Sequence, residues 1–120
     1  ARIVTGVKKH EHISSALKSL DWPRIDALVA RRDVTKVWKL LRAERVPPNV
    51  RGLLVPRSAV SARETRGTDG GSLHLQRCRL TSSQRAFSYR AAVTWNALPQ
   101  TVRDTETLRA FKTAVHSTFN

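Results

Sequence analysis

Short apolar runs at helical spacing, separated by prolines, constrain the fold of this chain more than any other feature. The clearest run lies near the C-terminus, where apolar residues recur at i, i+3, i+7 and i+11: Leu108, Phe111, Val115 and Phe119. This spacing places all four on one face of an α-helix, and Asp104 or Thr105 can cap its first turn. Because such segments bury their apolar faces by packing on one another, the sequence predicts a mainly α fold.

Two more helices are predicted upstream. Residues 13–20 form a short helix capped by Ser14 or Ser15, and Pro23 suits the first turn of a longer helix that ends near Ala43. Apolar residues of the longer segment cluster on two sides. Either the helix breaks near residues 32–33, or it is one long helix that is bent or contacts partners on both sides. The second interpretation is favoured, and the most basic side of this helix carries Arg31, Arg32, Lys36 and Lys39.

The stretch from 83 to 97 fits two patterns. Alternate residues from Phe87 to Trp95 are apolar or aromatic, as in a strand, but Phe87, Ala91, Trp95 and Leu98 also form a helical stripe. The length and the alanines favour a helix, at least over 90–96, that Pro99 ends. The structural interpretation of residues 95–99 is a helix end at which Asn96 bonds the freed backbone. Residues 50–55 predict one helical turn, and the alternation over 73–77 predicts one short extended segment.

These segments make up one domain. Residues 1–55 form a helical segment, 56–72 a flexible basic loop rich in Ser, Arg, Thr, Asp and Gly, and 73–120 a C-terminal helical motif packed on the first segment. The predicted fold is a small, mainly α, helical module with an arginine-rich central loop and at most one short extended segment. Its predicted core consists of aromatic and aliphatic side chains: Trp22, Trp38, Phe87, Trp95, Leu98, Leu108, Phe111 and Val115.

The charge of the chain is strongly positive. Its net charge is +13, from 22 basic and 9 acidic residues. Between Arg45 and Arg103, ends included, lie ten arginines, no lysine and two acidic residues, Glu64 and Asp69. Surface charge that serves solubility usually mixes both signs, whereas the planar guanidinium offers two parallel donors to phosphate oxygens. The pattern therefore favours a polyanionic partner, with a generic basic protein as the alternative.

The predicted nucleic-acid contacts are cationic side chains and one aromatic ring. Tyr89, flanked by Ser88 and Arg90, is the candidate for stacking on a base. The predicted phosphate contacts are Arg77, Arg79, Arg85 and Arg90, joined by Arg57, Arg63 and Arg66 from the loop and extended by Lys8, Lys9, Arg31 and Arg32.

No pattern for catalysis or metal binding is found in the sequence. A two-metal polymerase centre needs neighbouring carboxylates, and the five aspartates are scattered along the chain. The single cysteine, Cys78, cannot supply the cysteine pair typical of structural zinc, nor an internal disulfide. We therefore predict no catalytic residue, no metal, no cofactor and no small-molecule substrate. No apolar run has the length of a membrane span, and one cysteine suits a reducing, intracellular compartment, nuclear or cytoplasmic.

Several motifs occur in a characteristic order along the chain. They are Ala1-Arg2-Ile3-Val4-Thr5-Gly6, His12-Ile13-Ser14, Val37-Trp38-Lys39-Leu40-Leu41, Arg77-Cys78-Arg79, Arg85-Ala86-Phe87-Ser88, Trp95-Asn96-Ala97-Leu98-Pro99 and Leu108-Arg109-Ala110-Phe111-Lys112. In this order the chain resembles the C-terminal tail of the reverse-transcriptase polyprotein of LINE-type, non-LTR retrotransposons. It departs from the family's pattern at Ser83, where a glycine is usual, and at Ala91-Ala92, which lacks the usual proline.

The resemblance implies a place for this chain downstream of the catalytic domains. The parent polypeptide would be an RNA-directed DNA polymerase that nicks chromosomal DNA and copies its own RNA from the exposed 3′ end. Residues 1–55 would continue the polymerase thumb, and the tail would grip template RNA or target DNA without catalysing a reaction. Its partners would be nucleic acid and the rest of the polyprotein. The alternatives are a protein-interaction or structural module, and a host-domesticated derivative of such an element.

Overall fold

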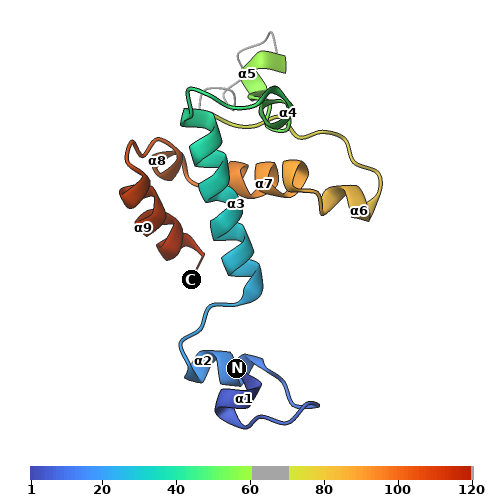
Figure 1. Cartoon of the computed structure of the whole chain (residues 1–120), viewed down its shortest axis with the longest axis vertical. Helices are drawn as coiled ribbons and strands as arrows, with labels where there is room; N and C mark the ends of the chain where they lie inside the picture. The colour runs from blue at the N-terminus through green and yellow to red at the C-terminus, as the bar shows by residue number, and fades with distance from the viewer. Residues whose placement is uncertain (61–70, 120) are drawn as a thin grey trace.

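The computed structural model of the chain describes residues 1–60 and 71–119. Within these ranges the fold is mainly α-helical, which confirms the predicted fold class (Figure 1). Its nine described helices are α1 (Arg2–Thr5), α2 (Ser14–Ser19), α3 (Ile25–Arg42), α4 (Pro48–Arg51), α5 (Arg57–Val60), α6 (Thr81–Gln84), α7 (Phe87–Asn96), α8 (Gln100–Arg103) and α9 (Leu108–Thr118).

Helix α3 is the axis of the fold. It runs without a break and packs against both α7 and α9 (Figure 1). The interpretation of one long, doubly contacted helix is confirmed. The buried residues of α3 all lie within 33–38, however, and Ile25 and Leu28 of the apolar cluster at its start are exposed, so that cluster does not serve either contact. Pro23 does not lie in the first turn as predicted, because Arg24, whose backbone is extended, is the N-cap residue of α3.

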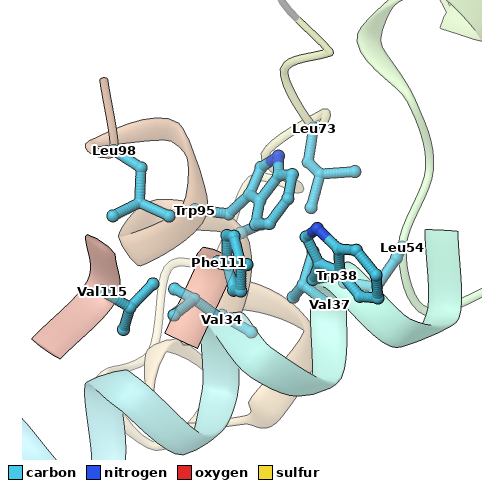
Figure 2. Packing of buried hydrophobic residues seen from close by; sticks show 11 residues of the cluster. Val34, Val37, Trp38, Leu54, Leu73, Trp95, Leu98, Phe111 and Val115 are labelled. Atoms are coloured by element: carbon cyan, nitrogen blue, oxygen red, sulfur yellow. The ribbon is translucent and has the colours of Figure 1, made fainter. Parts of the chain in front are cut away.

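The core lies where α3, α7 and α9 meet. The ring of Phe111 stands between two indoles, with centroids 5.8 Å from Trp38 and 5.9 Å from Trp95 (Figure 2). Leu54 and Leu73 are buried in the same cluster. The predicted core is confirmed for five buried residues, Trp38, Trp95, Leu98, Phe111 and Val115. Phe87 and Leu108 are partly buried and pack against them.

Trp22 is the exception among the predicted core residues. Its side chain is 49% exposed, so the prediction is wrong. It lies in the connection between α2 and α3, and α1 and α2 lie apart from the α3–α7–α9 core at the far end of the molecule (Figure 1). Asp21 before it has a left-handed backbone, with φ 52°, and the Trp22 N–H donates to the Leu17 carbonyl at 2.9 Å. The linker therefore holds Trp22 away from the core.

The extended segment after residue 71 is fixed to the end of α7. Its only ladder contact among the described residues is an antiparallel bridge between Leu73 and Pro56. The Asn96 amide donates to the Leu73 carbonyl and accepts from its N–H, both at 2.8 Å, and the Trp95 indole donates to the Gly71 carbonyl at 2.9 Å. The prediction that Asn96 bonds the backbone at its own helix end is wrong. Its side chain bonds Leu73, and carbonyls of the last turn accept from the backbone N–H groups of residues 97 and 98.

Some local predictions also differ from the structure. Arg57–Val60 forms helix α5 where a loop was predicted, and residues 61–70 of that segment lie outside the described residues. Helix α9 is capped by Thr107, whose hydroxyl accepts from the Ala110 N–H, and not by residue 104 or 105, because these residues end α8. Helix α2 begins after Ile13 without a side-chain cap, so neither predicted serine cap forms. The single turn predicted over 50–55 forms as α4, slightly earlier in the chain.

Candidate nucleic-acid interface

A groove of about 380 Å³ lies between α3 and α9, and basic side chains line both of its walls. The wall from α3 carries Arg31, Arg32, Lys36 and Lys39, and the wall from α9 carries Lys112 and His116. We call this the α3/α9 groove. It forms because the opposite side of α3, residues 33, 34, 37 and 38, is buried in the core, and helical periodicity then turns the basic residues outward.

Among the described residues, no carboxylate lines the α3/α9 groove. Its three lysines take part in no ion pair with any described carboxylate. Lys36 and Lys39 also line a neighbouring hollow that contains Phe87, and the Lys36 ammonium lies 6.0 Å from the centroid of that ring. The three lysines of the groove therefore present positive charge that no described carboxylate neutralises, whereas Arg32 is paired with Asp33 and Arg31 donates to the Phe119 carbonyl at 3.2 Å.

Helix α3 also carries Asp33, which is completely buried. Its carboxylate accepts from the Arg90 Nε at 2.7 Å, and the Arg32 guanidinium reaches the other oxygen at 3.5 Å. Arg90 also donates to the Arg85 carbonyl at 3.0 Å. Arg90 therefore joins α7 to α3, and the internal carboxylate partly neutralises its guanidinium, so its role as a phosphate contact stays a prediction.

Two other arginines are likewise built into the fold. Arg42 donates to the carbonyls of Arg103 and Thr105, at 3.0 and 3.2 Å, and its guanidinium lies 4.4 Å from the Trp38 ring centroid. Arg103 donates to the Ser72 hydroxyl at 2.9 Å. These contacts tie the α8 region to α3 and to the extended segment, so part of the arginine content serves packing.

A second hollow, of about 440 Å³, brings together three of the predicted contacts. Arg77, Arg79 and Tyr89 line it, with Cys78 and Leu75 beside them. Both arginines are exposed. The hollow shares no lining residue with the α3/α9 groove. Tyr89 lies beside the extended segment, whereas the next residue, Arg90, contacts Asp33 of α3.

The remaining predicted contacts are dispersed. Arg85 is exposed at the end of α6. Arg57 lies in α5 at one end of the molecule. Lys8 and Lys9 lie between α1 and α2 at the other end (Figure 1). Arg63 and Arg66 lie outside the described residues. The predicted cations therefore do not converge on one surface, and of them only Arg31 and Arg32 line the α3/α9 groove.

The prediction missed four residues of this groove. Lys36 and Lys39 were placed on the basic side of α3 but were not assigned to the site, although Arg32, Lys36 and Lys39 share one face at i, i+4 and i+7. Lys112 and His116 carry no such signal, because their place opposite α3 depends on the packing of α9.

Other kinds of site have no counterpart in the described part of the chain. No group of three or more metal-ligating side chains occurs there. None of the described helices combines the length and apolar character needed to cross a bilayer. No protein-family model, no curated protein and no solved structure matches the chain. The resemblance to retrotransposon tails therefore depends on the sequence motifs alone.

Proposed function

We propose that this chain is a non-catalytic nucleic-acid-binding module whose α3/α9 groove holds a sugar–phosphate backbone. The observation that carries the proposal is the charge of this groove, in which basic side chains from two helices face each other and no described carboxylate intervenes. Lysine and arginine bind nucleic acid by neutralising phosphates and releasing counterions. A positively charged groove that follows the backbone is the usual form of such a site.

The position of the groove on the core supports this proposal. Directly beneath its walls, Val34, Phe111 and Val115 are completely buried, so the helix backbones that carry the cations are fixed relative to each other. Side chains on packed helices hold a ligand-binding geometry better than side chains on loops. Helix α9 contains no acidic residue, which is unusual for a surface helix that serves solubility alone.

The sequence motifs suggest the biological setting. As the tail of a LINE-type reverse transcriptase, the chain would grip template RNA or target DNA during target-primed reverse transcription, in the nucleus or cytoplasm. Catalysis would belong to the upstream domains of the same polypeptide. A host-domesticated derivative would keep the groove with a new nucleic-acid target.

The salt dependence of binding tests the proposal. We compare the wild type with Lys36→Gln/Lys39→Gln/Lys112→Gln, and with a control of equal charge change outside the groove, Lys8→Gln/Lys9→Gln/Arg57→Gln. Fluorescence anisotropy with short labelled RNA and DNA gives log K against log salt. Each lost phosphate contact lowers the slope by about 0.7–0.9, so the groove variant should lose about 2–3 units. The control should lose less than one unit. Equal losses in the two variants, or binding independent of salt, would contradict the proposal.

A second function, protein interaction, is favoured by the N-terminal region. Helix α1 buries none of its residues, and Ile3 is 99% exposed beside exposed Val4. An apolar helix with no partner in the described chain suits docking on another protein, such as the polymerase domain of a LINE-type reverse transcriptase. The variant Ile3→Ser/Val4→Ser should weaken binding to that domain in calorimetry while its affinity for RNA and DNA stays unchanged. Unchanged binding to the domain would exclude α1 as the docking element.

A further inference from the structure

Trp22 differs from the other two tryptophans in its exposure. Its side chain is 49% exposed, compared with 9% for Trp38 and 2% for Trp95. A tryptophan on average buries most of its large surface, so a half-exposed indole points to a partner. Its backbone N–H is bound to the Leu17 carbonyl, and Pro23 follows it, so the main chain that carries the ring is held in place.

The indole lies at one end of the α3/α9 groove. Trp22 lines a hollow of about 520 Å³ whose other walls come from α2, α3 and α9. Arg31 and His116 line both this hollow and the groove, so the two adjoin at these side chains. Lys18 adds positive charge to the hollow, Arg24 beside it is paired with Asp26 at 3.2 Å, and Asp21 is the one carboxylate that lines the hollow among the described residues. A strand in the groove would therefore reach the indole.

We propose that the Trp22 indole stacks on an unpaired base of a strand whose phosphates occupy the α3/α9 groove. This inference rests on the proposed function and deepens it, because it names single-stranded RNA or DNA as the ligand. Base–aromatic stacking needs an accessible base face and accepts any base. In a duplex, both faces of each internal base are covered by its neighbours, so a duplex cannot use the indole in this way.

The charges around the ring agree with a base at this position. Lys18 can contact a phosphate beside the stacked nucleotide, and Arg31, whose guanidinium donates to the Phe119 carbonyl at 3.2 Å, adds positive charge where the hollow meets the groove. Asp21, next to the indole in sequence, repels a phosphate placed directly against the ring. A neutral base over the indole, with its phosphates displaced toward the cations, satisfies both conditions.

Intrinsic fluorescence provides the test, because stacking quenches an exposed indole and the other two tryptophans are buried. The intact chain is titrated with a single-stranded oligothymidylate, an abasic oligomer of the same length and a duplex. The single strand should quench Trp22 and bind about 5- to 150-fold more tightly than the abasic oligomer at equal salt. Trp22→Ala should abolish this preference and keep the abasic affinity, and Trp22→Phe should restore part of it. Leu80→Ala, at an exposed apolar residue outside the hollow, is the matched control and should change neither quantity.

The outcomes separate this inference from the proposed function. Equal affinity for the base-bearing and abasic strands, with no effect of Trp22→Ala, would overturn the stacking site. Salt-dependent binding of the abasic oligomer would then leave the proposed function standing. An indole that a LINE-type polymerase domain protects from acrylamide, while no oligomer quenches it, would also overturn the inference in favour of a protein contact. Failure of all three nucleic acids to bind would contradict both proposals.

Discussion

Two regions of α3 use positive charge in opposite ways. At the junction with α7, the partly exposed Arg90 meets the buried carboxylate of Asp33 at 2.7 Å, and an internal acceptor offsets its charge. At the α3/α9 groove, Lys36, Lys39 and Lys112 face outward with no described carboxylate beside them. The difference teaches that the number of arginines does not locate a polyanion site. What locates it is whether the fold already supplies an acceptor for each cation.

The two regions should therefore respond differently to substitution. Removing the cation of a buried pair leaves a carboxylate without its partner, which is strongly destabilising. Removing an exposed lysine leaves nothing buried and changes the free energy of unfolding little. The junction is expected to govern stability and the groove to govern binding.

The largest expected effect on stability belongs to the junction. Arg90→Ala should lower the free energy of unfolding by about 3–5 kcal/mol, because the Asp33 carboxylate then keeps only the longer contact with Arg32. Asp33→Ala should cost less, since the Arg90 side chain is 39% exposed and water can solvate it. Urea denaturation of the two variants measures both values. An Arg90→Ala variant with an unchanged free energy of unfolding, or a greater decrease for Asp33→Ala, would contradict this account of the junction.

The contact of α7 with the extended segment should show the next largest effect. Asn96→Ala removes two hydrogen bonds and leaves the N–H and carbonyl of buried Leu73 without their partner. The expected loss is about 2–3 kcal/mol in the free energy of unfolding, with the salt slope of binding unchanged. Gln100→Ala, at an exposed position in α8, is the control and should change stability by less than about 0.5 kcal/mol. A reduced salt slope for Asn96→Ala would show that the two regions are not separable.

The second hollow sharpens the comparison on the binding side. Arg77→Gln/Arg79→Gln should lower the slope of log K against log salt by less than about one unit, because a strand in the α3/α9 groove does not reach these arginines. A double substitution within the groove, Lys36→Gln/Lys39→Gln, should lower it by about 1.4–1.8 units. If the order of the two effects is reversed, the main site is the hollow around Tyr89.

The smallest expected effect on stability is that of Trp22. Trp22→Ala should lower the free energy of unfolding by less than about 0.5 kcal/mol, as for other surface positions. Trp38→Ala, by contrast, should cost about 3–5 kcal/mol, because that indole stacks on Phe111 in the core. Thermal or urea unfolding of the two variants checks this difference. A large loss for Trp22→Ala would show that the α2–α3 linker packs more tightly than the structure indicates.

Local sequence patterns predicted those parts of the fold that depend on one segment. The stripe from Leu108 to Phe119 predicted the buried face of α9, and the apolar cluster with Val34, Val37 and Trp38 predicted the buried face of α3. Trp22 was misassigned because apolar character alone does not show that a left-handed residue and a linker separate it from the core. The short helices α6 and α8 have little apolar pattern of their own and were not predicted.

The site could be predicted only in part, because it depends on contacts between distant segments. Asp33 and Arg90 are 57 positions apart, and nothing in either local sequence indicates that they pair. Lys112 joins Lys36 and Lys39 only through the packing of α9 on α3. The sequence established that the chain is basic and arginine-rich, but the fold decided which cations remain available to a ligand.

Lysine footprinting tests the central claim most directly. The chain has six lysines; Lys36, Lys39 and Lys112 line the groove, whereas Lys8, Lys9 and Lys18 lie in the N-terminal region. Acetylation rates are measured by mass spectrometry on the intact chain, with and without a single-stranded oligonucleotide. We predict that the oligonucleotide slows acetylation of the three groove lysines and leaves the rates at Lys8 and Lys9 unchanged. Protection of Lys8 and Lys9 with no protection in the groove would contradict the account.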